Sequence, residues 1–311
     1  MAKLEFRKMI WRHHRDQILV GLDLGTQHTK IVVAEVREDG QLNLIGFSKV
    51  DTLGIRKGEV HHHDDVLDSI HRAVIEAEKS VDGLEINRVE ISLTGRHISS
   101  FNNNGSTPIL SEDKEITPID VEDAISNAKL AALPQGHSSI HTIRQLFKVD
   151  DRDGVVDPVG LLGSRLEVGV HIIHGLTTSL QNTIRCVQAE ELEVGHTVFA
   201  GLSSALAVLT PQDKQQGALV LDIGAGVTEY VAYARGTIRC TGVLPVGGKN
   251  VTNDLAVALK IPFPQAERVK LEHLNLDPNP ADPDQIVTMK VGEFGLQERQ
   301  FALGDIQMVG A

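Results

Sequence analysis

Two short segments of this chain place the same chemical groups at the same spacing. Residues 19–33 read LVGLDLGTQHTKIVV, and residues 218–232 read ALVLDIGAGVTEYVA. Alignment of the two segments superposes Asp23 and Asp222, Gly25 and Gly224, Thr29 and Thr228, and Val32 and Val231. Each segment has an apolar strand that ends in an aspartate, then a glycine turn, then a second apolar strand. The repeat predicts a duplicated β-hairpin, because an internal repeat indicates duplicated architecture.

The chemistry of such a turn is phosphate binding. Without a Cβ, the backbone N–H groups of a glycine turn can approach phosphate oxygens closely. An aspartate at the end of the strand can hold a cation through its water molecules. One such turn by itself is more often an ordinary hairpin, but two copies in register favour a two-sided clamp on the phosphates of one nucleotide.

Composition limits the class of protein. A chain of 311 residues with 41% hydrophobic and 23% charged residues is typical of a globular protein of about two domains. The formal net charge of −12 argues against a broad electrostatic surface for nucleic acid. The two cysteines, Cys186 and Cys240, lack zinc-ligand spacing and suit a reducing cytoplasm.

Hydrophobic periodicity predicts the elements that position the two hairpins. The pattern predicts strands over 18–24, 30–36, 42–50, 89–93, 140–149, 165–173, 286–292 and 298–303. It predicts helices over 64–81, 117–133, 179–192, 198–209 and 251–259, and another from 264. The run Asn102–Gly105 predicts a turn. Residues 86–163 are expected to form an inserted α+β module.

Three other segments invite a functional interpretation. His61, His62 and His63 precede two aspartates, but adjacent residues at a helix start rarely converge on one metal ion, so solvated first-turn residues are favoured. The loop Asp150–Gly154 resembles a calcium loop without its terminal glutamate. Residues 1–17 are basic, and their apolar residues do not share one helical face, which favours a mobile leader over a membrane-surface helix.

The assembled motifs resemble the actin, sugar kinase and Hsp70 superfamily, and within it the bacterial cell-division FtsA family. The resemblance is carried by the two hairpins and by further segments, in order over about residues 18–275. These are GIRKGEV (54–60), ISLTGRHISSFNNNG (91–105), DPVGLLGSRLEVGVHIIHG (157–175), AGLSSALAVLTPQDKQQG (200–217), LPVGGKNVTNDLA (244–256) and AERVK (266–270). It implies an α/β actin-like, ribonuclease H-like duplicated fold of two lobes with an inserted α+β subdomain.

The resemblance implies ATP and Mg²⁺ as cofactors and a role for each site residue. Asp23 and Asp222 would orient Mg²⁺ through water. The residues expected to face phosphates are Gly25, Thr26, Gln27 and Lys30 in the first lobe, and Gly224, Ala225, Gly226, Val227 and Thr228 in the second. Gly247 and Gly248 would line the floor of the nucleotide site, and Glu267 and Lys270 would reach the ribose and base. A surface ion pair is the plainer interpretation of Glu267 and Lys270.

The resemblance also implies a domain plan. Residues 18–85 and 164–205 would form the first lobe, and residues 206–248 would begin the second. Residues 249–311 would form a second-lobe subdomain that receives the C-terminal tail of FtsZ. The segment after Phe301 supplies neither a late glycine-rich motif nor a basic amphipathic membrane helix, so the second lobe is expected to be incomplete and its membrane tail to be absent from this chain.

The expected function is that of an ATP-binding protein that self-associates and links FtsZ filaments, the Z-ring, to the cytoplasmic face of the membrane at the division septum. Residues Phe199–Leu202 carry no acid to position an attacking water, so at most a slow ATPase is expected. The alternatives are a pilus-assembly relative of FtsA, an ATP-dependent kinase or phosphatase of the superfamily, and a fragment that binds partners without nucleotide.

Overall fold

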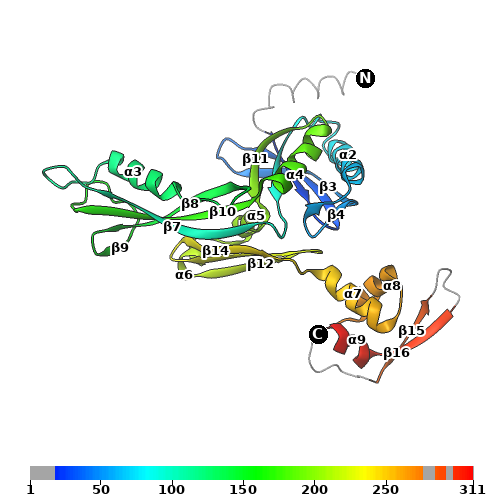
Figure 1. Cartoon of the computed structure of the whole chain (residues 1–311). Coiled ribbons are helices and arrows are strands. Elements are labelled where there is room, and N and C mark those ends of the chain that lie inside the picture. The colour runs from blue at the N-terminus through cyan, green and yellow to red at the C-terminus, as the bar shows by residue number, and fades with distance from the viewer. Residues whose placement is uncertain (1–17, 276–283, 292–296, 311) are drawn as a thin grey trace, which may run out of the picture. The chain divides into compact units, whose positions relative to one another are not determined.

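The computed structural model describes residues 18–275, 284–291 and 297–310 (Figure 1). The basic leader expected at residues 1–17 lies outside the described residues. The chain divides into two compact units. The first unit contains residues up to Asp222 and the stretch Val227–Pro245, and the second contains Ile223–Gly226 and the chain from Val246 onward. Each unit is described by itself.

The predicted strands and helices have counterparts in the structure. The strands are β1 (Ile18–Leu24), β2 (His28–Val36), β3 (Leu42–Asp51), β4 (Ile55–Arg56), β5 (Glu59–Val60), β6 (Arg88–Leu93), β7 (Ser99–Pro108), β8 (His137–Val149), β9 (Arg152–Val155), β10 (Arg165–Leu176), β11 (Glu193–Phe199), β12 (Ala218–Ile223), β13 (Thr228–Ala234), β14 (Thr237–Leu244), β15 (Ile286–Val291) and β16 (Gln297–Ala302). The helices are α2 (His63–Ser80), α3 (Pro118–Lys129), α4 (Thr177–Ala189), α5 (Ala200–Val208), α6 (Pro211–Gln216), α7 (Gly248–Leu259), α8 (Phe263–His273) and α9 (Leu303–Gly310). Strands β7 and β11 and helices α6 and α9 are among the elements that were not predicted.

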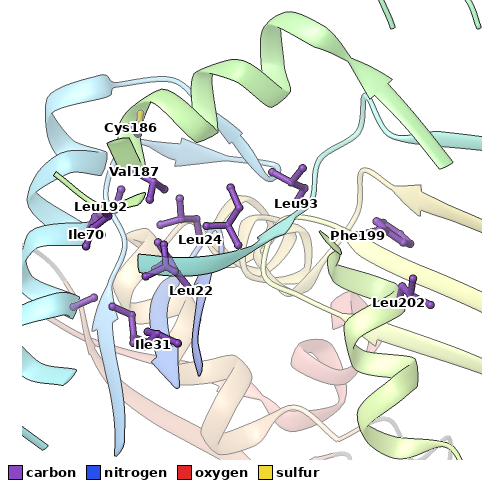
Figure 2. Close-up of a cluster of buried hydrophobic side chains, with 14 of the residues drawn as sticks. Leu22, Leu24, Ile31, Ile70, Leu93, Cys186, Val187, Leu192, Phe199 and Leu202 are labelled. Atoms are coloured by element: carbon purple, nitrogen blue, oxygen red, sulfur yellow. The ribbon is translucent and has the colours of Figure 1, made fainter. Parts of the chain in front are cut away.

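The first sheet of the first unit has the order β11-β6-β1-β2-β3. Strands β1, β2 and β3 form an antiparallel meander, whereas β6 and β11 run parallel to β1. Alternate residues of the meander are apolar and buried, among them Leu22 and Ile31. Figure 2 shows these side chains in one cluster with Ile70 of α2 and Val187 of α4. One face of the sheet is therefore fixed by two helices.

The second hairpin begins a second copy of the meander. Strands β12, β13 and β14 lie in that order in a three-stranded sheet, and β13 pairs with β14 antiparallel. Val231 and Tyr233 of β13 are buried in the same hydrophobic cluster as the first sheet. The duplicated hairpin predicted from the repeat is confirmed, and the mixed α/β fold with it.

A separate four-stranded sheet, β7-β10-β8-β9, forms the body of the inserted module, and α3 packs on it. Helix α3 begins with a capping box in which Thr117 and Asp120 bond each other's backbone N–H groups. Its small residues Ala124 and Ala128 face the sheet, and both are fully buried. The helix ends at Lys129, before the predicted residue 133.

The strand pairing moves two strands across the predicted boundary of the module. Strand β6, which the sequence assigned to the module, belongs to the first sheet, and β10, assigned to the first lobe, lies between β7 and β8. An alternating pattern shows which face of a strand is buried but not which strand pairs with it. The sequence therefore predicted where both strands lie along the chain, but not which strands they pair with.

The turn predicted at Asn102–Gly105 is wrong, because these residues lie inside β7. Asn103 Nδ2 donates to the carbonyl of Ala128 at 2.8 Å, so this asparagine ties the strand to α3. A Cβ on Gly105 would lie 2.2 Å from the backbone nitrogen of Ala128. The polar residues and the glycine that indicated a turn are used here for close helix–strand packing.

The second unit packs helices α7, α8 and α9 around a small core. Its fully or nearly fully buried side chains include Leu255, Val269 and Ile306. The hairpin β15–β16 contributes Val287 to this core. Arg299 Nη1 also donates to the carbonyl of Leu259, the last residue of α7, at 3.1 Å.

Candidate nucleotide site

The first hairpin presents a tight glycine turn with ordered neighbours. Gly25 N–H donates to the carbonyl of His28 at 3.1 Å, and a Cβ on Gly25 would lie 2.8 Å from that oxygen. Thr26 is buried, and its Oγ1 accepts a hydrogen bond from Gly58 N–H at 3.1 Å. Thr52 N–H donates to the carbonyl of Gln27 at 2.9 Å. The turn is thereby fixed before any ligand binds, and glycine is required at its first position.

Asp23 lies at the end of β1 with both carboxylate oxygens bonded. Ser92 Oγ of β6 donates to one oxygen at 2.6 Å, and Lys30 Nζ of β2 contacts the other at 3.3 Å. The side chains of Asp23 and Lys30 are 38% and 44% exposed, so both remain open to solvent. Lys30 therefore lies beside the aspartate of its own hairpin.

Asp222 occupies the equivalent place at the end of β12. Its Oδ2 accepts a hydrogen bond from Ser204 Oγ of α5. Val227, which follows the second turn, is buried, and Thr228 begins β13. The small-residue helix α5 therefore packs against the strand end that carries the second aspartate.

Glu229 is the residue that the sequence analysis missed. Only 4% of it is exposed, and its carboxylate accepts a hydrogen bond from Thr94 Oγ1. The pKa of Glu229 is raised to about 7, chiefly by burial; the hydrogen bond from Thr94 opposes this rise, and the negative charges of Asp222 and Asp23 add to it. The aspartates of the two hairpins thus act on the same buried carboxyl group.

The repeat itself contained a signal for Glu229. With Asp23 aligned on Asp222, the position of Lys30 in the first copy falls on Glu229 in the second. The sequence analysis includes Lys30 among the candidate site residues but does not include its counterpart, Glu229. Glu229 also lies beside the segment that lacks an acid, since a Cβ on Gly201 would be 2.9 Å from the Cβ of Glu229.

The second unit holds the turn of the second hairpin against the start of α7. Gly248 N–H donates to the carbonyl of Gly224 at 2.9 Å, and Lys249 N–H donates to that of Ala225 at 2.8 Å. A Cβ on Gly247 would lie 2.5 Å from the carbonyl oxygen of Gly224. Glycine is therefore required at position 247, where two backbone segments meet without room for a side chain, whereas a Cβ on Gly248 would meet only Lys270 Nζ at 3.6 Å and the Gly224 carbonyl at 3.9 Å.

Glu267 and Lys270 of α8 also contact the start of α7. Lys270 Nζ donates to Glu267 Oε2 at 2.7 Å, to Thr252 Oγ1 at 2.9 Å and to the carbonyl of Gly248 at 3.3 Å. Burial raises the pKa of Glu267, but hydrogen bonds from Lys270 and Thr252 outweigh it and lower the pKa overall. Glu267 and Lys270 therefore form an ion pair that also contacts the start of α7, through Thr252 and the carbonyl of Gly248. The pair is not an isolated surface ion pair.

The structure brings the predicted site residues together in two groups. The first unit holds Asp23, Gly25, Thr26, Gln27, Lys30, Asp222, Val227 and Thr228. The second unit holds Gly224, Ala225, Gly226, Gly247, Gly248, Glu267 and Lys270. To these the structure adds Ser92, Thr94, Ser204 and Glu229 in the first unit and Thr252 in the second.

The residues present fit a magnesium–nucleotide. The first glycine turn has no room for a Cβ at Gly25, and the carbonyl of Gly224 in the second turn leaves no room for a Cβ on Gly247. Two aspartates that are not fully buried stand at the strand ends before these turns. Asp23 already accepts bonds from Ser92 and Lys30, so it suits a magnesium ion held through water better than one held directly. When bound, Mg²⁺ would neutralise charge on the phosphates. Within the described residues, no three His, Cys, Asp or Glu side chains are grouped to hold a metal ion directly.

The described part of the chain contains no helix long and apolar enough to cross a bilayer.

Solved structures with a similar fold are actin-like. The structure of a PilM-PilN type IV pilus biogenesis complex aligns over 82% of this chain and 69% of that chain, with a TM-score of 0.58 and 18% identity. MreB 5 of Spiroplasma citri, solved bound to AMPPNP, aligns over 94% of this chain and 74% of that chain, with a TM-score of 0.50 and 14% identity. At these identities the likeness shows the actin-like fold alone.

Sequence comparison identifies the family. The family model for the SHS2 domain inserted in FtsA matches residues 95–174, and the model for cell division protein FtsA matches residues 219–306. The cell division protein FtsA of Pseudomonas aeruginosa is 36% identical over 257 residues, which are 83% of this chain and 61% of that protein. FtsA of Escherichia coli K12 is also 36% identical over 257 residues, with 60% of its length covered. The chain thus spans about three fifths of the relatives it matches, and it belongs to the FtsA family of cell-division proteins.

Proposed function

We propose that this protein binds ATP with Mg²⁺ through residues of its two hairpins, self-associates, and links FtsZ filaments to the cytoplasmic face of the membrane at the division septum. One observation supports nucleotide binding above all. Asp23 and Asp222, one from each copy of the repeat, both act on the buried carboxyl group of Glu229. Charges of one sign gathered at two glycine turns destabilise each other, and a bound cation would relieve that repulsion.

Nucleotide binding is tested by equilibrium dialysis with labelled ATP. Asp222→Ala removes the proposed cation holder of the second hairpin, and Gly25→Val places a side chain against the His28 carbonyl. Both variants should lose most binding, and removal of Mg²⁺ from the wild type should do the same. Gly21→Val is the matched control, because a Cβ there meets nothing within 4 Å. Equal affinity in all four proteins would exclude the clamp.

We propose that ATP turnover is slow, far below the value of about 10 per second that is typical of enzymes. Helix α5 begins at Ala200, and no acid lies between Phe199 and Leu202. The neighbouring Glu229 is held by Thr94. A phosphate-release assay measures the rate, and a kinase-like rate with a small-molecule acceptor would favour an enzyme of the same fold.

The proposed receiving surface for the FtsZ tail lies on the second unit. The candidate residues are the exposed apolar side chains Val257, Phe263 and Leu271 and the exposed cations Lys260 and Arg268. An acidic and apolar peptide would match both properties. Lys270 is engaged with Glu267 and the start of α7, so it is not counted in this surface.

Fluorescence anisotropy with an FtsZ tail peptide tests this surface. Leu271→Ser should weaken binding by about tenfold, the loss typical of an anchor side chain. Leu110→Ser is the control, since Leu110 is 83% exposed and lies in the first unit. No binding to the folded wild-type chain would count against this partner.

Self-association and membrane attachment need separate measurements. Sedimentation velocity with and without ATP and Mg²⁺ should show larger species only with nucleotide.

Co-sedimentation with anionic liposomes at physiological salt should leave this chain in the supernatant, because basic residues near an anionic surface contribute only about 1 kcal/mol each and salt screens them. Pelleting that disappears on deletion of residues 1–15 would show attachment through the basic leader.

A further inference from the structure

The first unit contains a polar cavity that none of the proposed nucleotide-site residues lines. It has a volume of about 280 Å³ and lies between the sheet of the inserted module and the β13–β14 hairpin. The lining residues that matter here are Gln145, Lys148, Gly154, Gly169, Arg235 and Arg239. We call it the bulge cavity.

Three β-bulges open on this cavity. Between β10 and β8 the register shifts so that Gly169 opposes both Gln145 and Leu146. Between β8 and β9 the extra residue is Gly154, and between β13 and β14 it is Arg239. A bulge disrupts the ladder and re-aims side chains, and bulges are common beside functional sites. The regular pairing of three strand pairs is thus interrupted around the bulge cavity.

Gln145 is fixed as part of the cavity wall. It is only 9% exposed, and its Nε2 donates to the carbonyl of Ile238 at 2.6 Å and to Asn102 Oδ1 at 3.0 Å. A Cβ on Gly169 would lie 2.5 Å from Gln145 Oε1, so the glycine makes room for this amide. Two hydrogen bonds and the room left by Gly169 thus hold the Gln145 side chain in the cavity wall.

The cavity carries an excess of unpaired positive charge. Lys148, Arg235 and Arg239 line it, and across the described residues their charged groups make no hydrogen bond or ion pair. Of the two acids in the lining, Glu167 pairs with Arg165 at 3.3 Å, which leaves Asp153. In a chain of net charge −12, three free cations around one hollow form a local site for an anion.

We propose that the bulge cavity binds a small multivalent oxyanion, a molecule with at least two phosphate or carboxylate groups. The cavity volume lies near the lower end of the range for small-molecule sites, about 300–1,000 Å³. Arginine presents a planar fork of donors that matches the oxygens of phosphate and carboxylate, and lysine adds a point charge. The site is separate from the nucleotide site and does not depend on it.

The experiment uses the whole chain labelled with ¹⁵N-glycine and follows amide shifts by NMR. The probes are pyrophosphate and citrate, which separate phosphate from carboxylate recognition. Gly154 and Gly169 report on the bulge cavity, whereas Gly25 and Gly224 report on the nucleotide hairpins. Saturable shifts at Gly154 and Gly169 with either probe are expected.

Variants assign the shifts to the cations. Arg239→Gln and Lys148→Gln should each weaken binding about tenfold, because each variant removes one cation that can form a charge-assisted hydrogen bond to the anion. Arg239→Gln keeps the backbone carbonyl that bonds Asn102, so the fold should be retained. Arg185→Gln, an exposed arginine of α4, is the control and should bind as the wild type does. Shifts confined to Gly25 and Gly224, or equal loss in all three variants, would overturn the proposal.

Discussion

Thr94 donates a hydrogen bond from its Oγ1 to the carboxylate of Glu229. Two residues earlier, at the end of β6, Ser92 donates to Asp23. The end of β6 therefore contacts a carboxylate beside each of the two hairpins. From this point the chain continues directly into β7 and the inserted module. The residues that lead into the module therefore hydrogen-bond to carboxylates of the candidate site.

Glu229 should make the stability of the protein depend on pH. Its pKa rises from 4.5 in the unfolded chain to about 7 in the fold, so the protonated form is favoured by folding. This contribution is complete below pH 4.5 and is lost as the pH rises to 7, by about 3 kcal/mol in all. Urea unfolding of the wild type and Glu229→Gln between pH 4.5 and 8 measures it. The difference between the two free energies of unfolding should change through this window, and a constant difference would contradict the prediction.

His171 should stay neutral well below pH 6. It is fully buried, and burial lowers its pKa to about 4. Nδ1 lies 2.9 Å from Asn102 Oδ1 and Nε2 lies 2.9 Å from Thr241 Oγ1. Because Asn102 Nδ2 donates to the carbonyl of Arg239, the amide oxygen faces His171, which places the ring proton on Nδ1.

A ¹⁵N NMR titration checks this assignment. The depressed pKa contributes stability that is complete above pH 6.5 and is lost as the pH falls through about 4. The neutral Nδ1–H tautomer of His171 should persist at pH 5. An Nε2–H tautomer, or a charged ring at pH 6, would refute the assignment.

Gly105→Ala should strongly destabilise the module. The new Cβ would lie 2.2 Å from Ala128 N and 2.4 Å from the carbonyl of Ala124, both in the backbone of α3. The helix must move, and overpacking of this kind costs about 1–3 kcal/mol or more. Gly21→Ala is the control, because nothing lies within 4 Å of its Cβ. Thermal unfolding should lower the Tm of the first variant only; equal Tm values would show that α3 yields easily.

Lys270→Met should loosen the start of α7. The substitution removes three hydrogen bonds and leaves Glu267 without its cation. Amide hydrogen exchange at Gly248 and Lys249 should accelerate, as expected when a partly buried charge loses its partner at a cost of about 1–3 kcal/mol. Arg268→Met, which breaks only the surface pair with Glu272, should leave these amides unchanged. Unchanged exchange in both variants would mean that the glycines hold the turn without Lys270.

The sequence by itself determined the local features of this protein. The repeat located both hairpins, because aspartate, glycine and alternating apolar residues act over a few neighbours. The Thr117-Pro118 start of α3 was predicted from the cap residues alone, since a capping box is a contact within one turn. The pair Gly247-Gly248 and the helix after it were likewise found from local sequence.

Only the tertiary structure decided which strands pair and which side chains meet. Strands β6 and β10 changed sheets relative to the prediction, because alternation fixes a buried face and leaves the partner open. Asn102 lies in a strand because His171 and the β14 edge supply its hydrogen-bond partners from distant parts of the chain. The importance of Glu229 depends on burial and on Thr94, Asp222 and Asp23, which are brought beside it only by folding. Desolvation and charge repulsion are properties of that assembled environment, so the types of the residues alone could not reveal them.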